Sequence, residues 1–490
     1  MRRIRLGNGA ATNSMLLVFV NVITTLIGMI ITKLLSVHFS LSEYGTYSQA
    51  LLITTTGTSI SILGLTNATN YFYNKTTEED KQRRYVTTIF SIQYVVGLLC
   101  AIIIVIFRDN IARYFGNPSL SRVLYIVALT PMMSNLIAMY QTLFVSIGEA
   151  KKIAVRNFVV SFIKLIGVLL ACFVVNNIVI VLVVILMMDI AQVLIFSSMF
   201  RRDRFSLNPI NTDRHIIKEI LQFSIPMAIY VMSNSLCRDI DKYVVSAFSD
   251  TETLAVYANA SKILPFDMLT TSLITVLIPI ITRFINQCEF SEAKKVFTLY
   301  LRIGYLLTFI LVGGAIAVAR HLMLFLYDEK YISGLSVFIV YLLIDMIRFA
   351  NVTTVLSGAG KSKILMYVSL LTLAANALFN IIAYNIIGIL GPAVVTLVLT
   401  IISTILLLHF GAKEIKTRIV SLFNFNEISI ILAEIVLFGT LSHFISNFLS
   451  SHKVPLFFVL AISYGFYMSV LFGLNFKRII RCYKDLNEYK

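Results

Sequence analysis

Apolar stretches of about 20 residues recur along the whole chain and are separated by short polar connections. A helix needs about 20 apolar residues to cross the hydrocarbon core of a bilayer. The pattern therefore predicts an all-α polytopic membrane protein with about fourteen transmembrane helices. The predicted spans are 14–37, 46–70, 85–107, 122–147, 154–175, 177–200, 219–248, 254–283, 297–320, 332–357, 364–384, 388–410, 428–447 and 454–474.

Composition supports the same class of protein. The 490 residues are 58% hydrophobic and only 13% charged, with a mean hydropathy of +0.85. A soluble core of this size could not bury so much apolar surface, so the excess must face lipid. The first apolar run follows Arg2, Arg3 and Arg5 but exceeds the length of a signal peptide, and it is interpreted as a retained helix.

Lysine and arginine are distributed very unequally between alternate loops. One set of loops and termini holds 28 of them, whereas the opposite set holds five, Arg108, Arg113, Arg320, Lys330 and Lys453. Positive loops tend to stay in the cytoplasm, so both termini are predicted to be cytoplasmic, as in a multi-pass protein of the bacterial inner membrane. The net charge of +16 then indicates contact with anionic lipid headgroups rather than with nucleic acid.

No catalytic, cofactor or metal motif emerges from the sequence. The five cysteines and six histidines show no metal-ligand or redox spacing. Gly360-Lys361-Ser362 ends like a phosphate-binding loop, but Val355 stands where the first glycine is needed. We therefore expect a transporter without a cofactor. Its energy would come from an ion gradient (H⁺ or Na⁺), the membrane potential or downstream consumption.

The two halves of the chain resemble each other weakly. Lys33, Phe39, Ser40 and Glu43 match Lys242, Phe248, Ser249 and Glu252 at an offset of 209, and Tyr47 and Ala50 match Tyr257 and Ala260 at 210. Gly148 and Lys151 match Gly358 and Lys361, also at 210. These matches predict two six-helix lobes, 1–210 and 211–420, related by a pseudo-two-fold axis along the membrane normal. Residues 421–490 would add two helices and a tail.

Charged residues inside predicted spans are the main functional signal. The densest group is Arg238-Asp239-Ile240-Asp241-Lys242, whose four charges would cost roughly 10 to 14 kcal/mol if they faced lipid. Helical spacing places Arg238, Asp241 and Lys242 on one face, where Asp241 offsets part of the positive charge. Such a face suits an anionic ligand. The alternative, that the group snorkels to the outer surface, stays open.

Other intramembrane charges extend or compete with this site. Lys33 holds the repeat-equivalent position and Lys262 lies in span 8, so both could converge on the same cavity. Arg302 is expected to snorkel to the cytoplasmic surface. Two further combinations, Asp345 with Arg348 and Lys164 with Asp189, are interpreted as structural ion pairs.

Span 2 is rich in hydroxyl groups. Residues 46–70 hold ten Ser or Thr. They could line a wet sugar-binding passage, or they could let helices pack closely. Both interpretations remain open on the sequence.

Several stretches together resemble the bacterial polysaccharide exporters that include O-antigen flippases. They are Asp241-Lys242-Tyr243, residues 256–262 (VYANASK), Pro279 to Phe284, Gly358 to Lys361, and Asn376 to Asn380 with Gly388 to Ala393. These exporters share a superfamily, MOP, with multidrug cation extruders and peptidoglycan-precursor flippases. The resemblance implies a V-shaped two-lobed fold. It also implies a polyprenyl-diphosphate-linked oligosaccharide substrate, engaged by Lys33, Arg238, Lys242 and Lys262, with polysaccharide polymerase and chain-length proteins as further partners.

Two other functions fit parts of the pattern. A multidrug cation antiporter would share the architecture but would favour acids in its cavity, whereas span 1 carries Lys33 and no carboxylate. A membrane-embedded glycan polymerase or ligase would normally need a large outer loop, and the outer loops here have about 15 residues or fewer.

Overall fold

The computed structural model describes residues 8–76, 78–202, 205, 214–267, 277–278 and 280–487, with the backbone alone at 8–19, 150, 214, 267 and 487. Throughout these residues the secondary structure is helical, without strands. The chain forms two compact units, which divide between Ala255 and Val256. The predicted all-α membrane fold is confirmed at this level.

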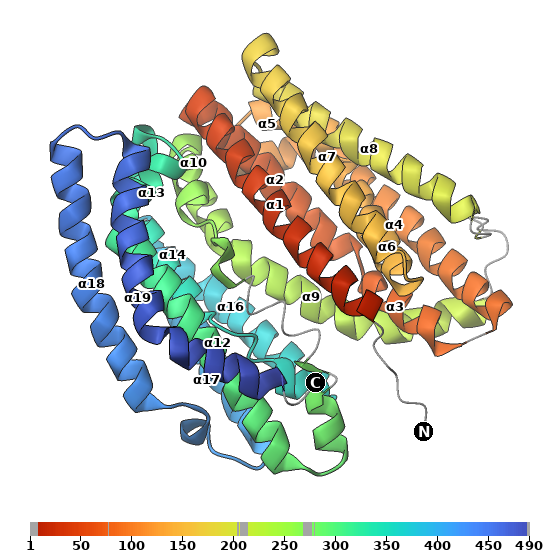
Figure 1. Ribbon diagram of the computed structural model, residues 1–490. Helices are drawn as coiled ribbons and strands as arrows, with labels where there is room; N and C mark the ends of the chain where they lie inside the picture. Colours follow the sequence, from red (N-terminus) through yellow and green to blue (C-terminus); the bar gives the residue numbers. More distant parts are fainter. Residues whose placement is uncertain are drawn as a thin grey trace. The chain divides into compact units, whose positions relative to one another are not determined.

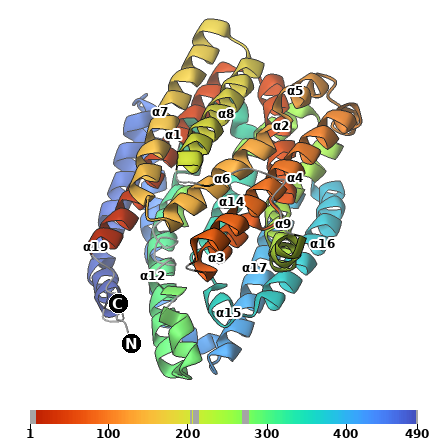
Figure 2. The same cartoon turned by 90° about the vertical axis from the view of Figure 1, so that its right-hand side faces the viewer.

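The first unit contains nine α-helices and the start of a tenth among its described residues (Figure 1). Helix α1 packs along α7, and the two run side by side in both ribbon views (Figures 1 and 2). The helices are α1 (Asn8–His38), α2 (Leu41–Ser61), α3 (Leu65–Lys75), α4 (Glu79–Tyr114), α5 (Ser119–Val127), α6 (Thr130–Ser146), α7 (Ala150–Leu170) with the π-turn η1 (Ala171–Val175), α8 (Ile178–Arg202), α9 (Arg214–Phe248) and α10 (Thr251–Ala260).

In the second unit, α12 packs against α14, α18 and α19, while α16 packs on α17. Its elements are η3 (Pro265–Asp267), α12 (Phe290–Ala317), α13 (Ala319–Leu326), η4 (Glu329–Gly334), α14 (Leu335–Ile347), α15 (Thr354–Gly358), α16 (Ser362–Ile387), α17 (Leu390–Glu414), η5 (Ile419–Leu422), α18 (Phe425–Ser451) and α19 (Leu456–Asn487). Helices α18 and α19 pack on α12 and on each other. These are the two additional helices expected after the six-helix repeat.

Twelve helices in the described part of the chain are long and apolar enough to cross a membrane. Of the fourteen predicted spans, 46–70 and 254–283 are the two that do not appear among them. The first is interrupted after Ser61, where Leu63 (φ 46°) and Gly64 (φ 67°) adopt left-handed backbone conformations. The second is interrupted after Ala260, and its residues 268–276 and 279, with Pro279 of the resemblance motif, lie outside the described residues.

Gly64 allows both the turn and a close helix contact. A Cβ atom built there would lie 2.5 Å from the Ser224 carbonyl oxygen of α9, and a positive φ is strained for residues with a side chain. The break therefore positions α9 against α2 and α3. An uninterrupted apolar helix was expected here because hydropathy does not register a two-residue change in backbone conformation.

The turns after α6 and α15 have the same backbone geometry. After α6, Gly148 (φ 95°) is followed by a hydrogen bond from the Glu149 nitrogen to the Phe144 oxygen. After α15, Gly360 (φ 69°) is followed by the same five-residue bond, from Lys361 to Leu356. Other helices of the chain end in the same way, so the repeat and its pairing of Gly148 with Gly358 stay predictions. The predicted lobe boundary at 210/211 lies outside the described residues.

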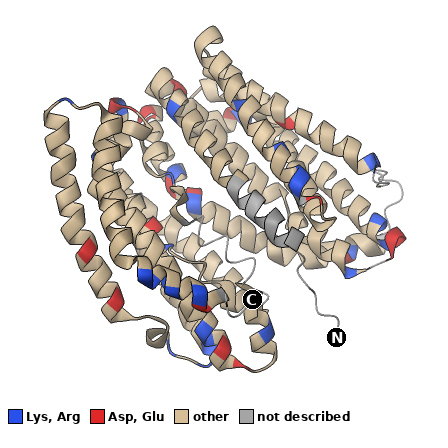
Figure 3. Ribbon diagram, viewed as in Figure 1, with Lys and Arg blue, Asp and Glu red and all other residues tan. Residues whose placement is uncertain are grey.

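Charge and exposure along single helices fit a membrane environment. The charged residues of α4 lie near its two ends, with an uncharged stretch between them (Figure 3). Within that stretch Val95 and Ile106 are 58% and 66% exposed, as lipid-facing side chains would be. Between helices α9 and α10, hydrogen bonds from the Thr253 side chain and from the Thr253 backbone nitrogen (2.7 Å) hold the pKa of the Asp250 carboxyl below its usual value.

Candidate functional site

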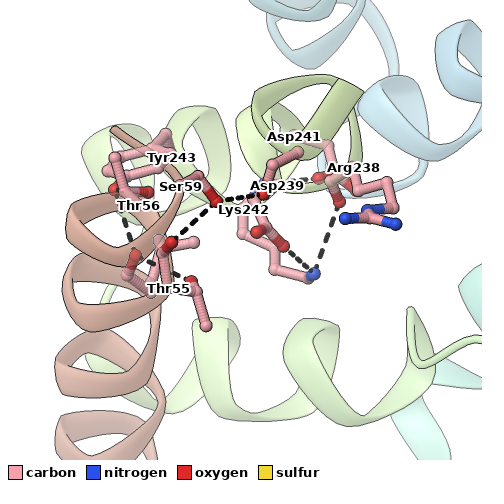
Figure 4. Close-up of polar contacts among 10 residues, drawn as sticks. Thr55, Thr56, Ser59, Arg238, Asp239, Asp241, Lys242 and Tyr243 are labelled. Carbon is pink, nitrogen blue, oxygen red and sulfur yellow. Dashed lines mark hydrogen bonds and ion pairs between the residues drawn. The ribbon is translucent and has the colours of Figure 1, made fainter. Parts of the chain in front are cut away.

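Helices α2 and α9 of the first unit meet along a row of polar side chains, which we call the α2–α9 seam. It comprises the pairs Gln49–Ser246 (3.3 Å), Thr56–Tyr243 (2.6 Å) and Ser59–Ser235 (2.6 Å). Figure 4 shows Thr56, Ser59 and Tyr243 of this seam beside the charged residues of α9. The Tyr243 hydroxyl also donates to the Leu52 carbonyl, 3.3 Å away. Small hydroxyl side chains of this kind let two helices approach closely and pair across the contact.

Most hydroxyls of α2 are satisfied by their own helix. Thr54, Thr58 and Ser61 donate to backbone carbonyls three or four residues earlier, at 2.6–3.0 Å. Such back-bonding is usual for Ser and Thr in apolar helices. The structure thus uses much of this hydroxyl run for helix packing. Thr55 is exposed and is available to line a polar passage as well.

The charged group predicted on α9 begins directly beside the seam. Lys242 Nζ lies 2.6 Å from Asp239 Oδ1 and 3.4 Å from the Arg238 carbonyl oxygen. Asp241 is fully buried, and its Oδ1 accepts a bond from the Lys242 backbone nitrogen (2.9 Å). The helical spacing had suggested Asp241 as the carboxylate that offsets the positive charge. In the structure, the ion pair of Lys242 is with Asp239 instead. The i,i+3 reach from Asp239 to Lys242 produces this pairing.

Arg238 is the exposed cation of this group. Its guanidinium points away from α2 (Figure 4), and within the described first unit no carboxylate oxygen lies within the 4.0 Å ion-pair distance. Asp239 is paired with Lys242, and Asp241 is buried. The charge that the group presents outward is consequently positive, although its four formal charges sum to zero.

The other two predicted site residues lie on different elements. Lys33 is half-buried on α1, in the first unit. Lys262 is half-buried directly after α10, in the second unit. The structure thus places Arg238, Asp241 and Lys242 together on α9, and Lys33 on another helix of the same unit.

Helix length gives a depth for these cations. At 1.5 Å of rise per residue, Lys242 lies about 9 Å, and Arg238 about 15 Å, from the end of α9 at Phe248. Lys33 lies about 8 Å from the end of α1 at His38. Both ends adjoin loops of the cation-poor set. The three cations therefore lie in the half of the helices nearer that side.

Arg302 has a carboxylate partner. Its Nε and Nη2 donate to both carboxylate oxygens of Glu427 on α18, at 2.7 and 2.6 Å, and the Tyr305 hydroxyl donates to the same carboxylate (2.7 Å). Sequence reasoning missed this partner because the two residues lie far apart in the chain, and the expected snorkelling of Arg302 stays a prediction. Asp345, expected to pair with Arg348, accepts a hydrogen bond from the Leu264 nitrogen (3.1 Å).

Lys164 and Asp189 do not form the ion pair expected from the sequence. Among the described residues, no carboxylate oxygen lies within 4.0 Å of Lys164 Nζ. Both side chains instead line a pocket between α1, α6, α7 and α8. Arg156 lines the same pocket, although the sequence placed it among the loop cations. Its spacing of eight residues from Lys164, about two helical turns, was the available signal.

Comparison with known proteins identifies the family to which the chain belongs. The family model described as "Polysaccharide biosynthesis protein" matches residues 30–336, more than half of the chain. The chain belongs to this polysaccharide biosynthesis protein family. A comparison with curated proteins found no matching sequence.

Solved structures similar to this family member are MOP-superfamily transporters. The lipid II flippase MurJ, in an inward closed conformation, superposes with a TM-score of 0.74 at 14% identity, covering 95% of this chain and 100% of its own. An inward-facing multidrug MATE transporter superposes with a TM-score of 0.67 at 11% identity, covering 80% of this chain and 94% of its own. A MOP transporter from Pyrococcus furiosus superposes with a TM-score of 0.59 at 11% identity, covering 83% of this chain and 94% of its own.

These likenesses identify the fold as that of the MOP superfamily and confirm the family resemblance seen in the sequence. The structural neighbours themselves are a multidrug transporter and a lipid II flippase. The chain is thus a multi-pass membrane protein with a transporter fold.

Proposed function

We propose that this family member is a flippase for lipid-linked oligosaccharide. It moves polyprenyl-diphosphate-linked glycan repeat units from the cytoplasmic to the outer leaflet by alternating access, for the assembly of a surface polysaccharide such as O-antigen or capsule. Both termini are cytoplasmic in this proposal, and the membrane is the inner membrane of a bacterium. The residues that engage the diphosphate and its sugars are Lys33, Arg238, Lys242 and Lys262. Asp241 belongs to the same site and offsets part of its positive charge.

The observation that carries the proposal is the exposed guanidinium of Arg238. It has no carboxylate partner in the described first unit, and a guanidinium matches phosphate oxygens in a bidentate geometry. Lys242 lies one helical turn along the same helix and is held by Asp239 (2.6 Å). A diphosphate bound at Arg238 would also attract Lys242. Lys242 would then exchange its ion pair with Asp239 for one with the diphosphate.

The depth of the cations fits the direction of transport. The basic loops mark the cytoplasmic side, so the opposite ends of α1 and α9 face outward. Arg238 then lies about 15 Å and Lys242 about 9 Å below the outer end of α9. A headgroup released toward the outer leaflet would pass these cations last.

The polar surroundings suit the glycan part of the substrate. Thr55 is exposed on α2, and the seam hydroxyls of Thr56 and Ser59 lie next to the charged group (Figure 4). Sugar hydroxyls can both donate to and accept from such groups. The polyprenyl tail stays in the hydrocarbon region, so only the polar headgroup needs a protein-lined path.

The charge of the candidate site also separates this function from a cation antiporter with the same fold. A cation substrate would be repelled by Arg238, whereas a diphosphate would be attracted. The MOP transporter from Pyrococcus furiosus is described as having a binding pocket of reverse polarity that suggests a different function. Pocket polarity is thus a reasonable feature on which to distinguish substrates within this fold.

The direct test replaces Arg238 by Gln. Export of glycan should fall about tenfold or more, corresponding to about 1.4 kcal/mol or more of lost ligand interaction, while the amount of folded protein stays constant. Arg238→Lys should retain part of the activity. Arg122→Gln is the matched control, because Arg122 is also exposed, unpaired among the described residues and on the first unit. Normal export by Arg238→Gln would remove Arg238 from the site.

Depletion of the protein tests the substrate class. Lipid-linked oligosaccharide should accumulate on the cytoplasmic leaflet of depleted cells. Leaflet sidedness can be measured by accessibility of the glycan to a non-permeant lectin in right-side-out and inverted vesicles. Unchanged glycan lipids together with new sensitivity to cationic drugs would contradict the proposal and favour the antiporter.

A further inference from the structure

A second polar site lies entirely inside the first unit. Helices α1, α6, α7 and α8 line an open pocket of about 420 Å³, within the range of about 300–1,000 Å³ typical of small-molecule sites. We call it the first-unit pocket. Its polar lining includes Gln141, Arg156, Asn157, Lys164, Asp189 and Gln192.

The α7 lining follows a strict helical face. Arg156, Asn157, Ser161 and Lys164 recur at spacings that return to one side of the helix every turn. Helix α6 presents Gln141 three turns after its first residues. Because these positions repeat on facing helices, the polar surface is continuous rather than a single buried defect in an apolar bundle.

Arg156 has hydrogen-bonding capacity that the protein does not use. Its Nη2 donates to Gln192 Oε1, and its guanidinium lies over the Phe196 ring, 4.3 Å from the centroid. The Nε and Nη1 atoms are buried and have no hydrogen-bond partner in the described structure. Buried donors without a partner are uncommon in folded proteins and point to a missing ligand or water.

The charges around Arg156 leave a net positive pocket. Lys164 has no carboxylate within 4.0 Å in the described residues. Asp189, only 8% exposed, accepts a hydrogen bond from Gln192 Nε2 (3.2 Å). The pocket therefore holds two cations and one carboxylate. A ligand with one negative charge would neutralise the pocket, whereas a cationic ligand would be repelled.

We propose that the first-unit pocket binds an acidic sugar residue through its carboxylate. The unused Nη1 and the second hydrogen of Nη2, whose first donates to Gln192, form the fork that a carboxylate accepts in bidentate fashion, and the unused Nε faces a sugar hydroxyl. Gln141, Asn157 and Ser161 supply amide and hydroxyl groups for the ring hydroxyls. This assignment rests on the proposed glycan cargo. It adds that the cargo contains a uronate-type sugar, recognised apart from the diphosphate at Arg238.

The balance of charge argues for a carboxylate in preference to a phosphate monoester. Asp189 already lies in the pocket, and a second negative charge on the ligand would face it without a further cation. A monoanion leaves the pocket neutral. This gives Asp189 the role of limiting which anions enter.

The test uses the purified full-length protein in detergent and sodium glucuronate as the probe. Titration calorimetry or saturation-transfer NMR should detect glucuronate binding, with no binding of glucose at the same concentration. Arg156→Gln should weaken binding about tenfold or more, because a charge-assisted pair is lost. Asp189→Asn should strengthen it, since a repelling carboxylate is removed. Lys151→Gln, an exposed cation on the same helix, is the control and should bind normally.

Each contrary outcome has a distinct meaning. Equal binding of glucose, or unchanged glucuronate binding in Arg156→Gln, would overturn the assignment. Stronger binding of inorganic phosphate than of glucuronate would identify a phosphate site instead. Arg156→Lys, which keeps the charge but not the fork, should bind weakly and serves if Arg156→Gln does not fold. Arg238→Gln should bind glucuronate normally while losing export, so the two proposals can fail separately.

Discussion

Two arginines inside predicted membrane spans, Arg302 in the second unit and Arg238 in the first, illustrate opposite solutions to the same problem. Arg302 makes two hydrogen bonds to Glu427, which also accepts from Tyr305. Arg238 is exposed, with no carboxylate within 4.0 Å in the described first unit. Both were conspicuous in the sequence for the same reason, the cost of a charge in hydrocarbon.

The difference separates a structural charge from a functional one. The Arg302 guanidinium and the Glu427 carboxylate are both largely shielded, with side-chain exposures of 29% and 6%. Their hydrogen bonds tie α12 to α18 within the second unit. Arg238 makes no such connection within the described first unit, so we expect its partner to come from outside that unit. This reasoning predicts different consequences when each arginine is removed.

The largest expected effect is on stability, from Arg302→Gln. The substitution leaves Glu427 buried and unpaired, which should cost about 3 kcal/mol and lower the Tm by several degrees in detergent. Arg238→Gln should change the Tm very little. The measurement is the thermal unfolding of both variants. Because the chain contains no Trp, unfolding is monitored by light scattering or by a thiol-reactive dye.

An exposed ion pair provides the control for that comparison. Lys361 and Glu414 lie 3.5 Å apart, and the lysine side chain is 48% exposed. Glu414→Gln should therefore alter stability by about 0.5 kcal/mol or less. If Arg238→Gln destabilised the protein as much as Arg302→Gln, Arg238 would have to be assigned a structural role.

A smaller effect is expected from Tyr305→Phe. This substitution removes the hydroxyl that donates to Glu427 (2.7 Å) and leaves the Arg302 pair intact. Hydrogen bonds to charged groups contribute about 1.5–3 kcal/mol, so the loss should be about 1.5 kcal/mol and less than that of Arg302→Gln. The Tm of the two variants, measured side by side, gives the order. A larger loss in Tyr305→Phe would mean that the ring, rather than the carboxylate, organises this contact.

The comparison also explains which parts of the molecule sequence reasoning could reach. Long apolar runs predicted the membrane helices and the two additional helices α18 and α19, because hydropathy is a property of contiguous residues. It could not predict the interruption at Leu63 and Gly64, which depends on backbone conformation. Nor could it predict Glu427 as the partner of Arg302, since the two lie 125 residues apart.

The candidate site was predictable in location but only partly in its contacts. Charge density singled out residues 238–242, and helical spacing correctly grouped them near one another. The choice between Asp239 and Asp241 as the partner of Lys242 depended on side-chain direction relative to α2, which a single sequence does not contain. The first-unit pocket depends on four helices that the fold brings together, so sequence reasoning assigned Arg156 to a loop.

A hydrogen bond across the α2–α9 seam should contribute less than either contact of Glu427. Tyr243→Phe removes the bonds to Thr56 and to the Leu52 carbonyl. A neutral hydrogen bond contributes about 1 kcal/mol, so a stability loss of about 1 kcal/mol is expected, with export retained in proportion to folded protein. Thr56→Val should behave similarly, and the double variant should add little. Additive losses would show that the two hydroxyls act independently.

The smallest stability effect is expected from the ion pair within the candidate site. Lys242 and Asp239 are 2.6 Å apart, with side-chain exposures of 20% and 19%, and they are neighbours on one helix rather than a link between two. Such i,i+3 pairs contribute about 0.2–0.5 kcal/mol. A double-mutant cycle of Lys242→Gln with Asp239→Asn should therefore give a small coupling energy, whereas the same cycle for Arg302 and Glu427 should give a large one. Export should respond in the opposite order: Lys242→Gln impairs it, and Asp239→Asn, which frees the lysine for an anion, preserves or increases substrate binding. A large coupling energy at Lys242 combined with normal export in both single variants would place this pair with Arg302 as structural, and would leave Arg238 without the neighbouring cation that the proposed diphosphate site requires.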